Sequence, residues 1–386
     1  MNALPIVVVG AGIGGLSVAA ALERVGCEVV VLERRTTIAE VGAGISLWPS
    51  ALAALDVLGV GDQVRAAGGA VASGGVRRPD GTWLTRVYSG LAEARMGEPM
   101  IALLRADLIA TLAAQLESTT LRVSATVDDF ELRGDHVRVL LSDGTFVTCG
   151  GLIGADGITS TIARTLHFDL RPHYAGYTAW RGIADLAIGD HVPSETWGPG
   201  GEFGFIPLGD ERMYWFATQN TSEGGRNTEG ELDYLKVRFA KWHQPIPSIL
   251  ATSRPELVLR HDIYDRAELR HWSNGPVTLI GDAAHPMRPH LGQGGCQAIE
   301  DAVVLADALT EFSEPSVAFQ AYEAARRRRT SQIVAASRSL GRVIQSQHRF
   351  AIHVQRLLTA VPTSLALRQM AKVGGYQAFR RSRRVR

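Results

Sequence analysis

The sequence has few of the features that mark secreted, metal-binding or nucleic-acid-binding proteins. It contains only three cysteines, Cys27, Cys149 and Cys296. Their odd number and wide spacing fit neither a disulfide framework nor a metal site, which favours a reducing cytoplasm. A net charge of +1 gives no electrostatic case for nucleic acid as a partner. No Walker loop, nucleophile elbow, internal repeat or low-complexity linker is visible, and we expect no metal cofactor.

An uncharged run at residues 4–22 has the length of a membrane-spanning helix. The basic segment that precedes the apolar part of a signal peptide is missing before it. The glycine spacing favours a different interpretation, in which a short β-branched strand at residues 6–9 leads into a glycine turn and an alanine-rich helix. We therefore expect a cytoplasmic protein, with a membrane span as the alternative.

The order of the patterns along the chain indicates an α/β fold. A strand–turn–helix–strand unit occupies residues 5–33, and a strand followed by a helix returns after residue 276. Between them, residues 174–218 alternate as in an antiparallel sheet, with a turn at Gly209 and Asp210. The length of 386 residues, 46% of them hydrophobic, is enough for two domains.

The expected boundaries follow from these patterns. The nucleotide-binding domain takes residues 1–75, 100–170 and 275–320, the substrate-binding sheet domain takes 76–99 and 171–274, and residues 321–386 form a C-terminal helical segment with a basic tail. Smaller elements expected in the first domain are a glycine-rich loop at 41–49, helices near 50–58 and 105–117, and strands at 121–127, 137–144 and 146–157.

A glycine cluster lies at the first turn. The sequence VVVGAGIGGL places Gly10, Gly12 and Gly15 as G-x-G-x-x-G between a strand and a helix. The first glycine allows a tight turn, the second lets the backbone approach a pyrophosphate, and the third lets the helix pack closely on the strand. Glu33 ends the next strand, where a carboxylate accepts from both hydroxyls of a ribose. The pattern predicts FAD or NAD without a 2′-phosphate; the alternative is a glycine hinge with a packing role only.

A second glycine cluster follows a later strand. Residues 276–280 have the apolar pattern of a buried parallel strand, and Asp282 lies just beyond its carboxyl end. An unpaired carboxylate there would be costly, and the hydroxyls of a ribityl chain would satisfy it. Gly292, Gly294 and Gly295 then precede a helix and offer bare N–H groups to a flat, negatively charged ligand. Since NAD has no need for a second site so far along the chain, the two clusters together predict FAD.

Four motifs give the sequence a resemblance to the single-component FAD-dependent aromatic hydroxylases, also called group A flavoprotein monooxygenases. They are GAGIGG at 10–15 with Glu33, Arg105 in LLRADL, GADGITS at 154–160, and GDAAHPMRPHLGQGGCQAIEDA at 281–302. The stretch YAGYTAWRG at 174–182 is similar to the branch of salicylate, urate and quinolone hydroxylases and zeaxanthin epoxidase. The resemblance implies a Rossmann-like FAD-binding domain with an inserted, mostly antiparallel β-sheet substrate domain and C-terminal helices.

The resemblance also implies the chemistry and the cofactor contacts. NAD(P)H reduces FAD, O2 forms a C4a-hydroperoxyflavin, and one oxygen atom hydroxylates or epoxidises an aromatic or electron-rich small molecule. Pro289 is implied as a wall beside the reactive edge of the flavin, and Tyr214 as a second catalytic residue. We expect FAD to contact Gly10, Gly12, Ile13, Gly14, Gly15, Glu33, Arg34, Gly44, Arg105, Val127, Asp156, Asp282, Gly292, Gln293, Gly294 and Gly295.

Aromatic residues of the sheet domain form the expected substrate pocket. Tyr214 and Phe216 alternate along one strand, and Phe203 and Phe205 lie on the strand before it. Together with Pro289 they predict an aromatic-lined cavity, with an ordinary sandwich core as the alternative. Urate-hydroxylating relatives carry an arginine about where Glu202 stands, and an acid there would repel an anionic substrate. The resemblance therefore argues against urate.

Several polar residues allow more than one interpretation. His285 and His290 suggest a general base, but the flanking prolines favour a structural role. Arg326–Arg329 is expected to be a solvated helix face, and residues 379–386 a frayed basic tail. The segment 349–361 is amphipathic, and contact with a membrane surface is its less favoured interpretation.

Two other classes of function share these motifs. A flavin-dependent dehydrogenase or halogenase would use the same scaffold, although the halogenase pattern W-x-W-x-I-P is absent. A non-catalytic FAD- or ligand-binding protein is the second class, and NAD(P)H oxidation stimulated by substrate separates it from an enzyme. The substrate, the choice between NADH and NADPH, and the oligomeric state leave no signature in the sequence.

Overall fold

The computed structural model describes residues 4–38, 43–168, 170–189, 191–209, 211–347 and 363–375. Asp210 of the expected turn, the amphipathic segment 349–361 and the arginine-rich tail at 379–386 lie outside these residues, as do residues 41 and 42 of the expected loop.

A parallel sheet forms the centre of the first structural unit. Its order is β18-β12-β1-β2-β8, and each neighbouring pair is parallel. The strands are β1 (Ile6–Val9), β2 (Val29–Leu32), β8 (Thr120–Arg122), β12 (Gly151–Gly154) and β18 (Val277–Leu279). The central strand β1 is buried along its whole length, as its run of β-branched residues predicts.

The uncharged run near the N-terminus divides between β1 and the helix α1 (Ile13–Arg24). Helix α1 has 12 residues, fewer than a bilayer requires. None of the helices in the described ranges combines the length and the apolar character that a membrane crossing needs.

Two segments depart from their predicted structure because partners distant in sequence pair with them. The expected loop contains the strand β3 (Gly44–Leu47), which pairs with β7 (Met100–Leu104), itself paired with β4 (Gly69–Val71). The expected strand at 146–157 splits at Gly150 into β11 (Phe146–Cys149) and β12, which belong to different sheets. Strand β11 joins β10 (His136–Leu141) and β9 (Val127–Arg133) in an outer sheet.

Short helices surround these sheets. They are α2 (Pro49–Val57), α3 (Gly61–Ala67), α4 (Leu91–Met96), α5 (Arg105–Ala113) and α6 (Thr161–Leu166). Helix α5 ends four residues before the predicted end at 117 and begins at Arg105, one of the expected cofactor residues.

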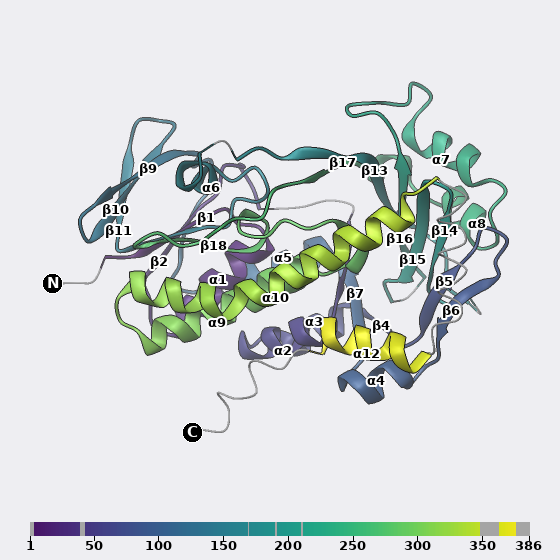
Figure 1. Ribbon diagram of the computed structural model, residues 1–386, viewed down its shortest axis with the longest axis horizontal. Coiled ribbons are helices and arrows are strands. Elements are labelled where there is room, and N and C mark those ends of the chain that lie inside the picture. Colours follow the sequence, from purple (N-terminus) through teal and green to yellow (C-terminus); the bar gives the residue numbers. More distant parts are fainter. Residues whose placement is uncertain are drawn as a thin grey trace.

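A seven-stranded sheet forms the second unit, in the order β17-β13-β16-β15-β14-β5-β6. It lies at the right of Figure 1, away from the parallel sheet. The strands are β5 (Gly74–Arg77), β6 (Trp83–Val87), β13 (His173–Ala184), β14 (Ser194–Gly198), β15 (Gly201–Pro207), β16 (Met213–Asn220) and β17 (Leu259–Asp265). Helices α7 (Glu231–Phe239) and α8 (Ile246–Ala251) cover one face of this sheet.

The register of this sheet corrects the predicted substrate pocket. Phe205 pairs with Trp215 across β15 and β16, so these two side chains share a face. Phe203 stacks on Trp215 at 5.6 Å between ring centroids and meets Phe239 of α7 edge-on at 5.3 Å. Phe203 and Phe205 therefore belong to the core under α7 and α8, and the prediction that they share a cavity with Tyr214 was wrong.

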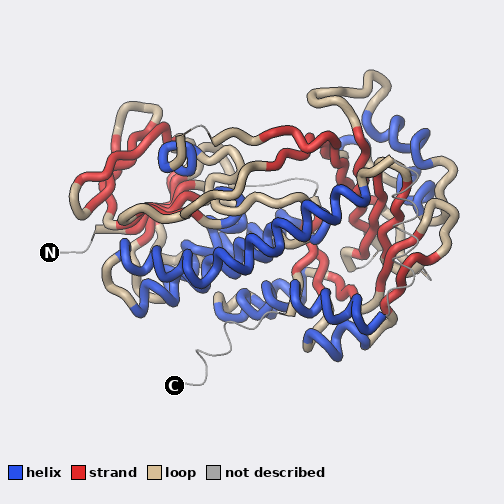
Figure 2. Tube along the Cα trace, in the orientation of Figure 1, coloured by secondary structure: helices blue, strands red, loops and turns tan. Residues whose placement is uncertain are grey.

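The long C-terminal helices connect the two units. Helix α9 (Gly294–Glu311) follows the second glycine cluster, and α10 (Pro315–Ile344) runs from the parallel sheet to the seven-stranded sheet (Figures 1 and 2). The Tyr322 hydroxyl donates to the Leu279 carbonyl at 3.1 Å, and Gln345, just after α10, donates to Thr218 Oγ1 at 2.6 Å. The part of the expected C-terminal segment that α10 and Gln345 form is thus bonded to both units.

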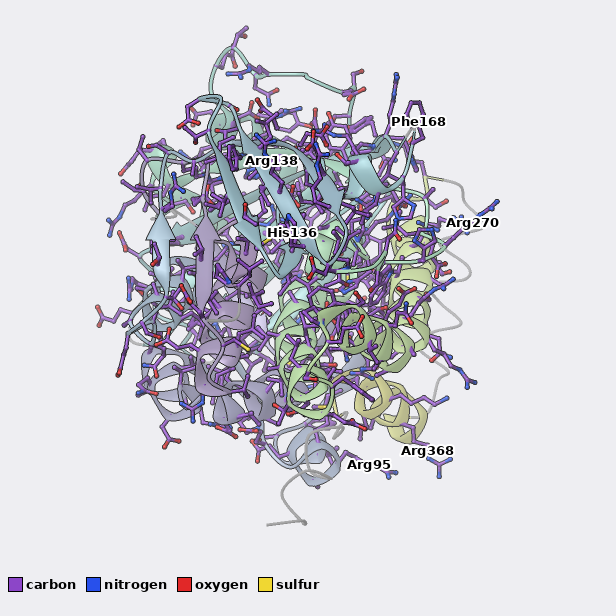
Figure 3. All side chains as sticks on the ribbon, turned by 90° about the vertical axis from the view of Figure 1, so that its left-hand side faces the viewer. Arg95, His136, Arg138, Phe168, Arg270 and Arg368 are labelled. Carbon is purple, nitrogen blue, oxygen red and sulfur yellow. The ribbon has the colours of Figure 1, made fainter. Side chains whose placement is uncertain are left out.

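Helix α12 (Thr363–Gly374) packs against α4. Arg95 of α4 and Arg368 of α12 point outward from this pair in Figure 3. Arg329 of α10 donates to the Val373 carbonyl at 2.8 Å, which holds the end of α12 against the longer helix.

Candidate functional site

A cavity runs along the carboxyl edge of the parallel sheet, where open α/β sheets bind ligands. Both glycine clusters contribute to its wall, although they lie on different parts of the chain. Of the residues expected to contact FAD, the cavity is lined by Gly10, Gly12, Ile13, Gly14, Glu33, Arg34, Arg105, Val127, Asp156, Asp282, Gly294 and Gly295.

The first glycine turn has the geometry that a close ligand requires. Gly10 has a φ of 102°, in the left-handed region that favours glycine. A Cβ at Gly15 would lie 1.8 Å from the Gly10 carbonyl oxygen, so Gly15 allows the helix to pack on the turn. Apart from Gly12 and its two chain neighbours, no heavy atom of the described residues lies within 4 Å of a Cβ built at Gly12. The start of α1 therefore opens to the cavity, where its free N–H groups favour a pyrophosphate.

Glu33 is held at the same turn. Its Oε2 accepts from the Ala11 N–H at 2.7 Å and its Oε1 from the Arg35 N–H at 2.8 Å. Only 9% of Glu33 is exposed, and what is exposed lines the cavity. Each carboxylate oxygen has a second lone pair. The pair of oxygens can therefore accept from the two ribose hydroxyls of an adenosine.

Asp156 follows β12, which lies on the other side of β1 from the strand that Glu33 follows. Its Oδ2 accepts from the Thr161 N–H at 2.7 Å, whereas its Oδ1 is buried and receives no donor from the described part of the chain. Burial raises the pKa of this carboxyl. A buried acceptor without a partner costs free energy, and a hydroxyl of a bound cofactor would satisfy it.

Asp282 lies in the 3-10 turn η2 (Gly281–Ala283), and its side chain is exposed to the cavity. The surrounding protein raises the pKa of Asp282, and the charges of His285, Arg105 and Arg266 oppose that rise. Asp282 and Arg105 thus place a carboxylate and a guanidinium on one cavity wall. This combination suits a ribityl chain next to a pyrophosphate.

Arg266 was not predicted from the sequence. It is 2% exposed and donates to the Ala283 carbonyl at 2.7 Å, which fixes the turn that carries Asp282. Burial lowers the pKa of Arg266 to about 10, while Asp282 and Asp156 act in the opposite direction. It follows β17 of the second sheet, so no motif near either glycine cluster indicates it.

Other cavity residues were also missed. Arg35, Thr37, Ile38, Ala125 and Thr126 line the end next to Glu33. A signal for two of them was available, because β8 lies beside β2 and Ala125 and Thr126 follow its carboxyl end.

Four expected contacts lie outside the lining of the cavity. Gly15 packs the helix, and Gly292 ends the 3-10 turn η3 (Pro289–Leu291) with a φ of 60°. The Gln293 side chain is fully buried and accepts from Gln297 Nε2 at 2.9 Å, pointing along α9. Gly44 lies against the ring of Tyr214.

Helices α9 and α10 enclose a charged network behind the second glycine cluster. Asp301 Oδ2 is 2.6 Å from His285 Nε2 and accepts from the Gly281 N–H at 3.0 Å. Arg326 donates to Asp301 at 2.7 Å and to Glu300 at 2.6 Å. Burial raises the pKa of Asp301, but the charges of His285 and Arg326 hold it below its usual range.

This network corrects the prediction for the arginine run. Arg326 is fully buried between the two helices, so it is not part of a solvated face, while Arg328 is exposed as predicted. His285 is committed to Asp301, which gives it a structural role beneath the turn of Asp282.

The loop between Asp282 and Gly292 is bonded to the seven-stranded sheet. His290 Nδ1 lies 3.0 Å from Glu202 Oε1, and His290 Nε2 lies 3.0 Å from the Tyr177 hydroxyl. All three side chains are buried. Burial raises the pKa of Tyr214, and the neighbouring Arg181 opposes that rise. Pro289, Tyr214 and Phe216 lie outside the lining of the cofactor cavity, and Tyr214 and Phe216 pack in one hydrophobic cluster.

Comparison with known proteins agrees with this arrangement. The family described as FAD binding domain matches residues 3–337. Aurachin C monooxygenase/isomerase of Stigmatella aurantiaca is 39% identical, over 94% of this chain and 95% of its own. The 3-amino-4-hydroxybenzoate 2-monooxygenase PtnB3 of Streptomyces platensis is 35% identical, over 97% of this chain and 96% of its own. The structure of Klebsiella pneumoniae HpxO complexed with FAD and uric acid has a TM-score of 0.88 at 27% identity, covering 96% of both chains.

Proposed function

The chain belongs to the family of FAD-dependent aromatic hydroxylases, and on this premise we propose that it is an NAD(P)H-dependent monooxygenase of an aromatic small molecule. The family, the fold class and FAD as the cofactor, each predicted from the sequence, are confirmed. The use of NAD(P)H, the identity of the substrate and the individual roles of the site residues belong to the proposal.

The single observation that carries the proposal is the meeting of both glycine clusters in one cavity. Glu33 would hold the adenosine ribose, and the N–H groups at the start of α1 would hold the pyrophosphate. Asp156 Oδ1 and Asp282 would accept from hydroxyls of the ribityl chain. Bound FAD supplies the redox chemistry, taking a hydride from a nicotinamide and activating O2.

The chain's own residues would position substrate and exclude water. The N–H groups at Gly294 and Gly295 begin the 18-residue helix α9, whose dipole stabilises nearby negative charge by about 0.3 to 2 kcal/mol. Tyr214, Phe216 and Pro289 would form the wall between this loop and the seven-stranded sheet. Their apolar surfaces would keep water from the reacting oxygen.

The names of the relatives support a class of substrate. The Streptomyces platensis relative is named for 3-amino-4-hydroxybenzoate, an aromatic ring with an amine and a hydroxyl group. We infer an electron-rich aromatic substrate that carries oxygen or nitrogen substituents, because such rings react readily with an electrophilic oxygen donor.

Isotope labelling tests the function. The purified protein should be yellow and release FAD on heating, and NAD(P)H oxidation should accelerate with a substrate selected from phenols, aminophenols and quinolones. Turnover under ¹⁸O2 should place one labelled oxygen atom in the product, and the yield of H2O2 should fall when the true substrate is present. Label that enters only from H2¹⁸O would instead favour a dehydrogenase or hydratase, and a protein that releases only FMN would contradict the cofactor assignment.

A further inference from the structure

Two carboxylates of the cofactor cavity follow neighbouring strands of the parallel sheet. Asp156 comes two residues after the end of β12, and Asp282 comes three residues after the end of β18. Among the described residues, the last backbone hydrogen bond between these strands runs from the Ile280 N–H to the Gly154 carbonyl at 3.0 Å. Beyond this bond the sheet no longer sets the spacing of the two segments, so a different group has to hold Asp156 and Asp282 in place.

The Arg266 guanidinium bonds to both segments. Its Nη2 donates to the carbonyls of Ala283 and Ala284, at 2.7 and 3.3 Å, in the segment that follows β18. Its Nη1 makes a longer contact of 3.5 Å with the carbonyl of Ile158, in the segment that follows β12. A guanidinium is planar and its N–H groups point in fixed directions. One rigid group thus bridges the two segments beyond the end of the sheet.

Arg266 comes from the other structural unit. It follows β17, an edge strand of the seven-stranded sheet, which lies on the side of the FAD-binding unit in Figure 1. The last residue of β17 is Asp265, which pairs with His173 on β13. The Asp265 carboxylate accepts from Arg288 at 3.0 Å and from Arg338 of α10 at 2.8 Å. The end of the strand is therefore held by bonds of its own, and Arg266 extends from a fixed base.

The charge of Arg266 reaches the site as well. Its side chain is buried and is not part of the cavity lining, and burial lowers its pKa only to about 10, so it is positively charged at neutral pH. The surrounding protein raises the pKa of Asp282. The charged groups that oppose this rise are His285, Arg105 and Arg266. Arg266 therefore favours the ionised form of Asp282, whose two oxygens both accept hydrogen bonds.

We propose that Arg266 is a positioning residue of the FAD site, because its bridge sets the spacing of Asp156 and Asp282 so that both carboxylates meet hydroxyls of one cofactor. The inference rests on the proposed function, in which these two carboxylates contact FAD. Without the bridge, FAD would have to order the two segments on binding, which lowers its affinity. Since Arg266 belongs to the sheet unit, the FAD site is complete only when that unit is packed against the parallel sheet.

Two substitutions separate the hydrogen bonds of Arg266 from its charge, and fluorescence titration of the folded, FAD-free proteins with FAD measures their effects. Arg266→Met removes both, and FAD should bind about 10- to 100-fold more weakly, the range for hydrogen bonds to a charged group. Arg266→Lys keeps the charge, but one ammonium cannot reach both segments, so a loss of about 3- to 10-fold should remain.

Arg270→Met is the matched control. Arg270 lies four residues further along the chain, is exposed, and points away from the protein in Figure 3. Its substitution should change FAD affinity by less than about 2-fold, as for other surface positions. An Arg266→Met variant that binds FAD as tightly as this control, or an Arg266→Lys variant that does so, would overturn the proposed bridge.

The pH dependence of FAD affinity distinguishes positioning from a purely structural role. As the pH falls, protonation of Asp282 should weaken FAD binding, and loss of the Arg266 charge should move this weakening to higher pH. Arg266→Met should show the shift, whereas Arg266→Lys should weaken over the same pH range as the wild type. A purely structural role would lower the free energy of unfolding and leave this profile unchanged, which would refute the proposal. If Arg266→Met does not fold, the loss of affinity in Arg266→Lys still tests the bridge.

A double-mutant cycle tests whether Arg266 acts through the carboxylate. In the Asp282→Ala background, Arg266→Met should cost less FAD affinity than it does in the wild type, by about 2-fold or more. Strictly additive losses would overturn the proposal. Its failure is also distinguishable from failure of the proposed function. A loss of FAD affinity with Asp282→Ala but not with Arg266→Met refutes only the role of Arg266, whereas the expected losses without ¹⁸O incorporation refute the monooxygenase and support the positioning role.

Discussion

Gly44 of β3 lies directly against the ring of Tyr214 on β16, and a Cβ at Gly44 would come within 2.4 Å of Tyr214 Cγ. This contact joins the FAD-binding unit to the seven-stranded sheet. Gly44→Ala should therefore destabilise the protein by about 1 to 3 kcal/mol, the range for overpacking a well-packed contact. Denaturant unfolding of the FAD-bound protein measures the change.

A double-mutant cycle checks that the contact with Tyr214 causes the destabilisation by Gly44→Ala. Combining Gly44→Ala with Tyr214→Ala should recover part of the loss, with a coupling of about 0.5 to 3 kcal/mol. Gly225→Ala is the matched control, since the atom nearest to a Cβ built at Gly225 is the Ser222 carbonyl oxygen at 3.4 Å, an ordinary contact distance. Strictly additive effects of the two changes would contradict the contact.

The arginine run on α10 provides a second comparison. Arg326→Met should cost about 3 to 5 kcal/mol of unfolding free energy, because it leaves Glu300 and Asp301 buried without their shared cation. Arg328→Met, two residues away and exposed, should change the stability by less than about 0.5 kcal/mol. Equal effects of the two substitutions would mean that the buried network does not contribute to stability.

The cofactor cavity was largely predictable because its determinants are local. Gly10, Gly12 and Gly15 define a turn through their spacing, and Asp282 follows a strand that reads as buried. In a parallel α/β sheet the carboxyl ends of all strands lie at one edge, so the two glycine clusters are expected to meet there. Arg266 was not predictable in this way, since it reaches the Asp282 turn from the end of a strand in the other sheet.

The faces on which the aromatic side chains of β15 and β16 lie were harder to predict, because they depend on the pairing register of the two strands. The alternation of side chains within β15 and within β16 was visible, but only their pairing shows that Phe205 shares a face with Trp215. The burial of Arg326, in contrast, could have been predicted from the sequence. The buried positions Phe319, Tyr322, Arg326, Thr330 and Ile333 recur every three or four residues, which places Arg326 on the inner face of α10.

Asp282 should contribute to FAD affinity through hydrogen bonds to hydroxyl groups. Asp282→Ala should weaken FAD binding by about 1 to 3 kcal/mol, the cost of leaving such groups unpaired. Asp307→Ala, on the exposed side of α9, is the control and should bind FAD as the wild type does. Fluorescence titration of the FAD-free protein with FAD gives both constants, and an unchanged constant for a folded Asp282→Ala variant would place the cofactor's hydroxyls elsewhere.

Glu195 should make stability depend on pH. Its folded-state pKa of about 8 lies above the ordinary value of 4.5, so between these limits the native protein binds a proton that the unfolded chain does not. Its contribution to stability is therefore complete at acidic pH and is lost as the pH rises toward 8. Glu195→Gln removes this titration and keeps a neutral side chain of similar size.

The stability of Glu195→Gln relative to wild type should rise between pH 5 and pH 9, by about 1 to 3 kcal/mol, and level off above the folded-state pKa. Urea unfolding of the FAD-bound proteins at several pH values measures the difference directly. Glu131→Gln removes an exposed carboxyl on β9, and its difference from wild type should stay flat over the same range. A flat difference for Glu195→Gln as well would show that Glu195 is already ionised at neutral pH, which would contradict its raised pKa.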